Sequence, residues 1–268
     1  MEGFPEFETL DLEAERGWLT VWLNSPENRN ALTPERARDL TALCSMLATS
    51  AGIRGVVFRG RGGVFCAGGD LKSFGRMMAD EADRDKLHAL SLDGAALFDA
   101  IHALPQFTIM AVEGAAMAGG LGMVCLGDHV IATGETKFAL SEVRIGLTPA
   151  QIAPFVIQRL GMRVGRSLML TGARFDGIEA QKIGLVDAVV DDADALTAAI
   201  EQQKKVMAGA APGAVAAIKA QIAQLPFQTR DGQKQAAADS FAGRMLSNEA
   251  REGIRAFAEK RKPSWTVE

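Results

Sequence analysis

The sequence predicts an α/β protein: strands and helices alternate through the first two-thirds of the chain, and the final third is helical. The alternation of short β-branched runs with helix-like stretches favours parallel strands joined by right-handed crossovers. Beyond residue 192 the segments are rich in Ala, Gln and Lys and contain no further strand pattern. We therefore expect a core at residues 1–192 and a helical subdomain at residues 193–268.

The first predicted elements are a hairpin and a helix. Residues 7–12 and 18–23 have strand patterns and are joined by the polar turn 13–17. Thr33-Pro34-Glu35 marks a helix start, because it supplies a hydroxyl cap, a proline at the first helical position and an acid in the first turn. Leucines follow at helical spacing, at Leu40, Leu43 and Leu47.

The middle of the chain alternates between buried strands and helices. Residues 53–59 form a β-branched run, and the glycine-rich loop 60–70 follows it. A periodic helix pattern spans residues 80–104 and ends at Pro105. The other elements predicted here are a strand at 107–112, a turn at Glu113-Gly114, a buried helix at 119–126, and strands at 129–132 and 137–140.

From Pro149 onward the pattern is mainly helical. Asp176 and Glu179 form a D-x-x-E capping box, which opens a short helix that closes at Gly184. The remaining predicted elements are a last strand at 186–190 and helices at 193–209, 212–224, 233–246 and 248–260, the last capped by Asn248.

The composition excludes several classes of protein. Hydrophobic residues make up 48% of the 268 residues, which is too many for a disordered chain. Lys and Arg number 29 against 33 Asp and Glu, and the net charge of -4 argues against a dedicated nucleic-acid binder. The most apolar stretch, 108–126, carries Glu113 and several glycines, so we interpret it as globular structure and expect no membrane span.

The cysteines and the first residues bear on compartment. Cys44, Cys66 and Cys125 are far apart and form no C-x-x-C pair, so we expect no disulfide framework and no metal site. The first ten residues contain no basic region followed by an apolar one, so we expect no signal peptide and a cytoplasmic protein.

Two glycine-rich loops each follow a predicted buried strand. The first contains Gly68-Gly69 and the second Gly119-Gly120. Open α/β sheets bind ligands at this end of their strands, and N–H groups at a helix start can face a ligand oxygen. The competing interpretation is that the glycines only allow tight packing. The dinucleotide fingerprint and the phosphate-binding G-x-x-x-x-G-K-[ST] motif are both missing.

A series of segments along nearly the whole chain carries a family resemblance. They are Asn30-Ala31-Leu32, 65–71 (FCAGGDL), 113–120 (EGAAMAGG), Asp128, 138–147 (FALSEVRIGL), Leu170-Thr171-Gly172 with Asp176 and Ala180, 184–186 (GLV) and 260–263 (KRKP). In this order they resemble the crotonase (enoyl-CoA hydratase/isomerase) superfamily. The resemblance implies a spiral core of ββα units with a helical C-terminal subdomain. It also implies a homotrimer or a dimer of trimers, in which that subdomain serves assembly and completes the coenzyme A site.

By this resemblance, the carbonyl of a coenzyme A thioester lies between the N–H groups of Gly69 and Gly119. Two fixed donors there would stabilise the negative charge of an enolate. No cofactor is implied, because coenzyme A enters as part of the substrate. Arg29 and Lys72 are expected to contact the phosphates of coenzyme A, and Lys260-Arg261-Lys262 could contact those of a neighbouring subunit. The competing interpretation is that each of these residues is a solvated surface charge. Further substrate contacts are implied at Ala31, Ala67, Gly68, Asp70, Leu71 and Gly120.

The well-known hydratases of this family hold water with two glutamates. The second matches Glu142, but the first falls at Gly122, which has no carboxylate. Glu142 alone could activate water and return a proton to Cα, and burial would raise its pKa toward the working pH. The competing interpretation of Glu142 is a capping or ion-pairing acid, with Arg144 as partner. Glu113 is a weaker candidate, and His88, His102 and His129 have no catalytic partner at a suggestive spacing.

One branch of the superfamily is particularly similar. Segments 115–122 and 140–155 resemble hydratases acting on 3-methylglutaconyl-CoA and isohexenylglutaconyl-CoA, which also lack the first glutamate. This implies a substrate with a second carboxylate, for which Arg144 is the candidate counter-charge. Three functions stay open: a hydro-lyase acting on an α,β-unsaturated acyl-CoA, a Δ3-Δ2 enoyl-CoA isomerase, and a non-catalytic acyl-CoA-binding relative.

Overall fold

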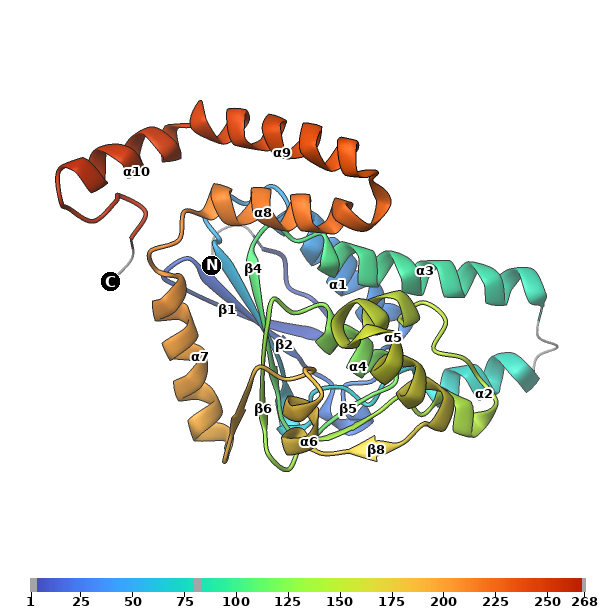
Figure 1. Ribbon diagram of the computed structural model, residues 1–268. Helices are drawn as coiled ribbons and strands as arrows, with labels where there is room; N and C mark the ends of the chain where they lie inside the picture. Colours follow the sequence, from blue (N-terminus) through green and yellow to red (C-terminus); the bar gives the residue numbers. More distant parts are fainter. Residues whose placement is uncertain (1–3, 80–82, 267–268) are drawn as a thin grey trace.

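The computed structural model describes residues 4–79 and 83–266, and a six-stranded sheet forms its core (Figure 1). The strand order is β1-β2-β3-β4-β6-β9, and every neighbouring pair is parallel except β1 with β2. This confirms the predicted α/β class with parallel strands. The strands are β1 Leu10–Glu15, β2 Trp18–Leu23, β3 Gly55–Gly60, β4 Phe107–Val112, β6 His129–Thr133 and β9 Ala188–Val190.

The N-terminal hairpin is real, but its predicted boundaries were wrong. The turn is only Arg16-Gly17, where both residues have positive φ, +49° and +78°. Glu13 and Glu15 belong to β1 and pair with β2. A two-residue turn with two positive φ angles matches the twist of a hairpin, and acidic side chains are common on an edge strand. The polar run therefore belongs to the edge of the sheet rather than to a loop.

A smaller sheet lies beside the first and contains strands that the sequence did not predict. Its order is β5-β7-β8, with β5 Ala115–Met117, β7 Lys137–Ala139 and β8 Arg174–Phe175. β5 pairs with β7 in parallel, and β7 pairs with β8 antiparallel. A single bridge between Cys66 and Ala116 attaches the glycine-rich loop 60–70 to this sheet. The small sheet therefore connects the two glycine-rich segments.

Several helix starts follow the predicted capping signals. The side chain of Thr33 accepts from the Arg36 N–H, and that of Asp176 accepts from the Glu179 N–H. The predicted helix 80–104 needs correction: its first residues, 80–82, lie outside the described residues, and α3 begins at Arg84 after the cap Asp83. A helix before it, α2, was not predicted. The helices of the core are α1 Pro34–Leu47, α2 Leu71–Ala79, α3 Arg84–His102, α4 Gly119–Cys125, α5 Ala153–Thr171 and α6 Gly177–Lys182.

The two faces of the large sheet are covered by different helices. Val56 and Phe58 of β3 face the main core with side chains of α1, α3, α4 and α5. Val57 faces the other side, where α7 (Ala193–Met207) contributes Leu196 and Ile200. The predicted boundary at residue 192 thus precedes a helix that packs on the sheet.

The last three helices lie farther from the sheet, with α9 and α10 extending beyond α8 (Figure 1). They are α8 Pro212–Gln224, α9 Arg230–Met245 and α10 Asn248–Ala258. The cap of α10 is Ser247, whose side chain accepts from the Ala250 N–H, so the prediction of Asn248 was wrong by one residue. α8 is fixed to the core because Lys219 pairs with Asp128 and donates to the Gln106 carbonyl at 2.7 Å.

Among the described residues, no single helix is both long enough and apolar enough to cross a membrane. One pair, α7 with the segment Pro212–Phe227, meets the criteria of length and composition only when taken together, with a bend of 99° between its parts.

Candidate active site

The backbone brings the two glycine-rich turns together. The Ala67 N–H donates to the Arg29 carbonyl at 3.0 Å, and the Leu32 N–H donates to the Gly68 carbonyl at 2.7 Å. On the other side of the loop, the Met117 N–H donates to the Cys66 carbonyl at 3.0 Å. The segment 66–69 therefore lies between the segments 29–32 and 115–118. This places the turn at Gly69 next to the turn at Gly119.

Close packing explains why several of these positions are glycine. A Cβ on Gly68, where φ is +91°, would lie 2.7 Å from the Met117 carbonyl oxygen. A Cβ on Gly119 would lie 2.9 Å from Cδ1 of Leu32. A Cβ on Gly120 would lie 2.5 Å from the Cys66 oxygen. The glycines thus allow tight packing, as the competing interpretation holds, and that same packing brings the two turns together.

The orientation of two peptide groups leaves two N–H donors available. In a trans peptide the C=O and the N–H point in opposite directions. The Gly68 carbonyl accepts from Leu32, so the Gly69 N–H of the same peptide points away from Leu32. The Ala118 carbonyl accepts from the Gly122 N–H at 3.0 Å, so the Gly119 N–H points away from α4. Within residues 4–79 and 83–266, neither N–H has a protein acceptor.

The turn before Gly119 is strained. Ala118 has φ +49° and ψ -120°, a conformation that residues with a side chain rarely adopt. Such backbone costs on the order of 1–3 kcal/mol and is concentrated at functional sites. The Ala118 N–H donates to the Ala139 carbonyl at 2.8 Å, and this bond holds the turn in place.

The same contact brings Glu142 toward the site. Ala139 ends β7, and Glu142 begins the 3-10 helix η3 (Glu142–Ile145) shortly afterwards. Oε2 of Glu142 is buried and has no hydrogen-bond partner in the part of the chain that the structure describes. Burial raises the pKa of the Glu142 carboxyl, and its own backbone N–H partly offsets the rise. A buried carboxylate oxygen without a partner is costly, so it is a strong candidate for chemistry.

The structure does not support Glu142 as an ion-pairing acid. Its candidate partner, Arg144, is exposed and directs Nε–H to the Gly172 carbonyl at 2.8 Å. Glu113, the weaker candidate, lies 3.5 Å from Arg59 in an ion pair. Its carboxylate is therefore engaged in holding the fold.

An apolar side chain occupies the space beside Gly122. A Cβ on Gly122 would lie 2.3 Å from Cγ2 of Ile152. Ile152 is 3% exposed and precedes α5. A carboxylate at position 122 therefore has no room, and Glu142 is left without a second acid there. The sequence pattern gave no signal for Ile152, because this contact joins residues that are distant along the chain.

The other predicted contacts lie on the rim of the two turns. Asp70 accepts from the Lys72 N–H at 3.0 Å and from the Ser73 hydroxyl, so its side chain helps to begin α2. Leu71, Lys72 and Arg29 are exposed, whereas Ala31 is buried. Arg261, from the predicted C-terminal cationic cluster, pairs with Glu252, and α10 lies across the molecule from α2 (Figure 1). Within this chain, that cluster is not brought to the glycine turns.

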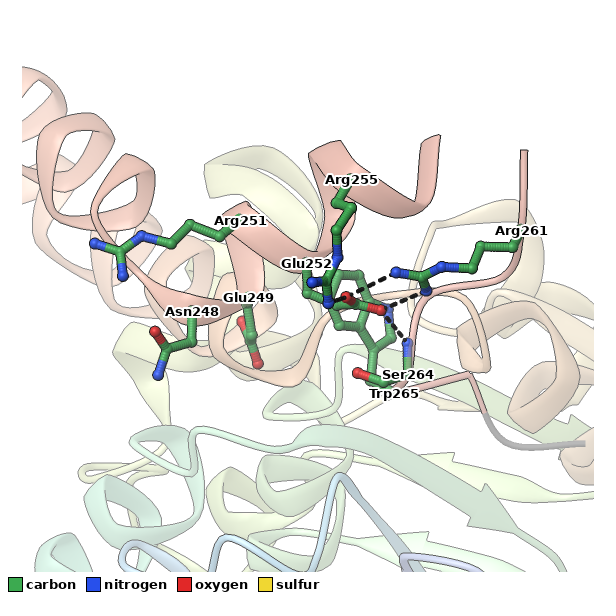
Figure 2. Close-up of a pocket in the computed structure, with 8 residues that line it drawn as sticks. All are labelled: Asn248, Glu249, Arg251, Glu252, Arg255, Arg261, Ser264 and Trp265. Carbon is green, nitrogen blue, oxygen red and sulfur yellow. Dashed lines mark hydrogen bonds and ion pairs between the residues drawn. The ribbon is translucent and has the colours of Figure 1, made fainter. Parts of the chain in front are cut away.

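Two surface cavities lie elsewhere. One, of about 780 Å³, is lined by α10 and the C-terminal segment, including Arg251, Glu252 and Trp265 (Figure 2). The Glu252 carboxylate accepts from Arg255, Arg261 and the Ser264 N–H. The other cavity, of about 410 Å³, is lined by the segments 134–137, 176–178 and 189–191. Neither of these two cavities includes the glycine turns or Glu142.

The remaining candidate residues show no reactive arrangement. In the part of the chain that the structure describes, no three His, Cys, Asp or Glu side chains group so as to hold a metal ion. Burial raises the pKa of Cys44, Cys66 and Cys125 to about 12, 11 and 12, so these thiols stay protonated. Burial also lowers the pKa of His102, whose ring lies against that of Phe155 at a tilt of 53°.

The family model described as enoyl-CoA hydratase/isomerase matches residues 13–268. A protein of Thermus thermophilus is 34% identical over 94% of this chain and 99% of its own length. The enoyl-CoA hydratase EchA19 of Mycobacterium tuberculosis is 33% identical over 92% of each chain. Among solved structures, Pseudomonas aeruginosa AtuE has a TM-score of 0.93 at 38% identity, covering 97% of this chain and 100% of that one. An enoyl-CoA hydratase/isomerase from Marinobacter aquaeolei has a TM-score of 0.92 at 34% identity, with the same coverage.

Proposed function

The chain belongs to the enoyl-CoA hydratase/isomerase family, and from this premise we propose that it adds water to an α,β-unsaturated acyl-CoA with Glu142 as its only catalytic carboxylate. The observation that carries the proposal is the buried Oε2 of Glu142, which has no partner among the described residues. Ile152 leaves no room for a carboxylate side chain at position 122, where the well-known hydratases have their first glutamate.

The two backbone donors supply the electrostatic part of the mechanism. The thioester carbonyl oxygen accepts from the Gly69 and Gly119 N–H groups, and negative charge develops on that oxygen as water adds. Donors that are already oriented stabilise this charge without reorganising, and one such donor is worth roughly 10²–10³ in rate. Because both donors are backbone groups, substitution of a side chain does not remove them.

Glu142 supplies the proton transfers. Its carboxylate takes a proton from water while the hydroxide oxygen bonds to Cβ, and the electron pair of the double bond moves to the thioester as an enolate. The protonated Glu142 then returns that proton to Cα, so the product contains one added water. A raised pKa favours the second step, because it brings the acid closer to the working pH. The reverse sequence removes water, and neither direction needs a cofactor beyond the coenzyme A of the substrate.

For the acyl group, we propose a branched substrate of the 3-methylglutaconyl or isohexenylglutaconyl type. The support is the resemblance of segments 115–122 and 140–155 to hydratases of that branch. Arg144 is exposed and follows Glu142 closely in η3, which makes it the candidate counter-charge for a second carboxylate. Arg144→Met should raise KM for a glutaconyl substrate and leave KM for crotonyl-CoA unchanged. Equal effects on both substrates would rule out this role.

We also propose which residues bind the coenzyme A phosphates and how the chains assemble. Arg29 and Lys72 are exposed beside the turns and are the proposed phosphate contacts. The helical subdomain 193–268 is proposed to form a homotrimer or a dimer of trimers, in which Lys260-Arg261-Lys262 reach a neighbour's coenzyme A. Large aromatic side chains exposed on this subdomain support an assembly role: Phe227 at 83%, Phe241 at 69% and Phe257 at 88%. Light scattering of the purified protein tests the assembly directly.

The presence of one candidate carboxylate, Glu142, is also compatible with a second activity. A single carboxylate suffices to move a proton between carbons of the same enolate, so Δ3-Δ2 isomerisation is the alternative. A panel of acyl-CoAs that includes 3-methylglutaconyl-CoA separates the functions. Loss of the ultraviolet absorbance of the enoyl thioester identifies the hydratase, and conversion of a 3-enoyl-CoA without hydration identifies the isomerase. Binding with neither reaction identifies a non-catalytic relative.

A further inference from the structure

Arg36 is a fully buried cation that the proposed mechanism does not use. It lies in the first turn of α1 and is 1% exposed. One guanidinium nitrogen, Nη1, donates to the Ala31 carbonyl at 2.8 Å. Nε and Nη2 are buried and have no partner among the described residues. A guanidinium buried in this way costs stability, so its position beside the glycine turns calls for an explanation.

A continuous line of hydrogen-bonded groups leads from Arg36 to the proposed site. The Ala31 carbonyl, which accepts from Arg36, shares a peptide group with the Leu32 N–H. That N–H donates to the Gly68 carbonyl at 2.7 Å, and the Gly68 carbonyl shares a peptide group with the Gly69 N–H. Two peptide groups therefore stand in series between the cation and the donor at Gly69. All the donors in this series point the same way, from Arg36 toward the ligand.

Arg36 has no direct ion-pair partner among the described residues, although carboxylates act on it from a distance. Burial lowers its pKa, but an arginine side chain stays protonated in proteins. Of the groups that act on it, Cys66 is a neutral thiol, because burial raises its pKa to about 11. Asp39 and Glu27 favour the charged form of Arg36 through space, but Asp39 accepts its hydrogen bonds from Thr9 and Glu27 is exposed. No ion pair with Arg36 is found in the described part of the chain.

We propose that Arg36 is a positioning residue for the oxyanion site, whose positive charge polarises the two-peptide relay through Ala31–Leu32 and Gly68–Gly69. Hydrogen bonds in series strengthen one another, and a cation at the far end makes the last N–H a stronger donor. The same line of bonds fixes the direction of the Gly69 N–H. The inference rests on the proposed function, because it requires the Gly69 N–H to contact the thioester oxygen.

The test uses three substitutions with a matched control. Arg36→Lys keeps the charge, Arg36→Gln removes the charge but keeps a donor, and Arg36→Met removes both. Arg38→Met removes the same charge from the exposed side of α1, where Arg38 lies 3.6 Å from Glu35. Each purified variant is compared with the wild type in thermal stability, in kcat and KM, and in the infrared C=O stretch of bound butyryl-CoA labelled with ¹³C at the carbonyl.

The relay predicts an order of effects that follows charge. Binding lowers the C=O stretch most in the wild type and Arg38→Met, nearly as much in Arg36→Lys, and least in Arg36→Met. kcat falls roughly 5- to 20-fold in Arg36→Met, less than the loss of a whole oxyanion donor, while KM changes less than twofold. If Arg36 acted only in folding, Arg36→Lys and Arg36→Gln would lower thermal stability without this order in the C=O stretch.

The outcomes separate the relay from the proposed function. If binding to the wild type does not lower the C=O stretch of butyryl-CoA, both the oxyanion site and the relay are overturned. If binding lowers the C=O stretch equally in the wild type and in Arg36→Gln, and kcat is also equal, the relay is overturned but the oxyanion site is not. Because Arg36→Gln keeps a donor to Ala31, the test holds even where Arg36→Met fails to fold.

Discussion

Two glutamates in different regions of the molecule have opposite environments. Glu252 lines the cavity at α10, where hydrogen bonds from Arg261, Arg255 and the Ser264 N–H hold its pKa well below the usual range (Figure 2). Glu142 begins η3 three residues after Ala139, which is bonded to the turn before Gly119; its Oε2 has no partner among the described residues, and burial raises its pKa. Glu252 thus lines a cavity with its carboxylate satisfied, whereas Glu142 lines neither described cavity and has an unsatisfied carboxylate oxygen.

The contrast shows which features indicate chemistry. A carboxylate with three donors is stable as an anion and has little tendency to accept a proton. A buried carboxylate oxygen with no donor binds a proton more readily and can pass it on. The unpaired N–H groups of Gly69 and Gly119 reinforce the point, because these donors also lack acceptors among the described residues. Unsatisfied polar groups are therefore the features that point to the proposed site.

Glu142→Gln should give the largest effect. The amide keeps the size of the side chain but cannot accept a proton from water, so hydration should slow by roughly 10²–10⁴. The rate is measured as loss of enoyl-thioester absorbance under saturating substrate. Glu252→Gln is the matched control and should keep kcat within about twofold, since it removes a carboxylate that is structural. Equal loss of kcat in the two variants would remove the distinction between them.

The packing of Ile152 against Gly122 is what excludes a second catalytic carboxylate at position 122. Gly122→Ala should lower the free energy of unfolding by about 1–3 kcal/mol, because the added Cβ overlaps Ile152. In combination with Ile152→Ala, which removes the Cγ2 that the added Cβ would meet, Gly122→Ala should cost less than it does alone. Gly94→Ala is the control, since a Cβ on Gly94 meets nothing within 4 Å and alanine favours the helix. Equilibrium denaturation checks these values, and a wild-type stability for Gly122→Ala would mean that Ile152 does not block the position.

The raised pKa of Glu142 predicts how stability changes with pH. When the folded-state pKa lies above the unfolded value, the native protein holds its proton longer, so stability falls as pH rises through the interval between the two values. Glu142→Gln removes this loss and should therefore be more stable than the wild type at neutral pH. Below the ordinary glutamate pKa of about 4.3 the difference should vanish. Thermal unfolding of both proteins across pH measures this difference. A Glu142→Gln variant that is less stable than the wild type at neutral pH would contradict the account.

Glu252→Gln should produce the smallest effect, with the opposite dependence. Its lowered pKa means that the ion pairs stabilise the protein above the unfolded pKa and that this contribution is lost as pH falls. Glu252→Gln should lower the melting temperature slightly at neutral pH, and the difference should shrink in acid. The group is exposed, so salt should reduce the difference further. A melting temperature equal to that of the wild type at low salt would show that these ion pairs contribute nothing.

Local signals predicted much of the fold. The caps at Thr33 and Asp176 gave the correct helix starts, because capping uses residues that are neighbours in sequence. β5 was missed because its three residues have no periodicity, and its pairing partners come from a distant part of the chain. The position of α2 was missed for a related reason, since its start depends on the side chain of Asp70.

The site was predictable in part. The two glycine turns and Glu142 were predicted from motifs and the family resemblance, and the structure brings the turns together through hydrogen bonds with the segment 29–32. Ile152 and Arg36 were not found. The role proposed for each depends on contacts between segments that are not adjacent in the sequence, and no local pattern encodes it.

The central claim is that one carboxylate, Glu142, both activates water and protonates Cα. The most direct test is hydration of the best acyl-CoA substrate in D₂O, followed by proton NMR of Cα in the product. The account predicts one deuterium at Cα with the wild type, and loss of hydration and of Cα exchange to the same degree in Glu142→Gln. A Glu142→Gln enzyme that no longer hydrates but still exchanges the Cα proton of a 3-hydroxyacyl-CoA at the wild-type rate would contradict it.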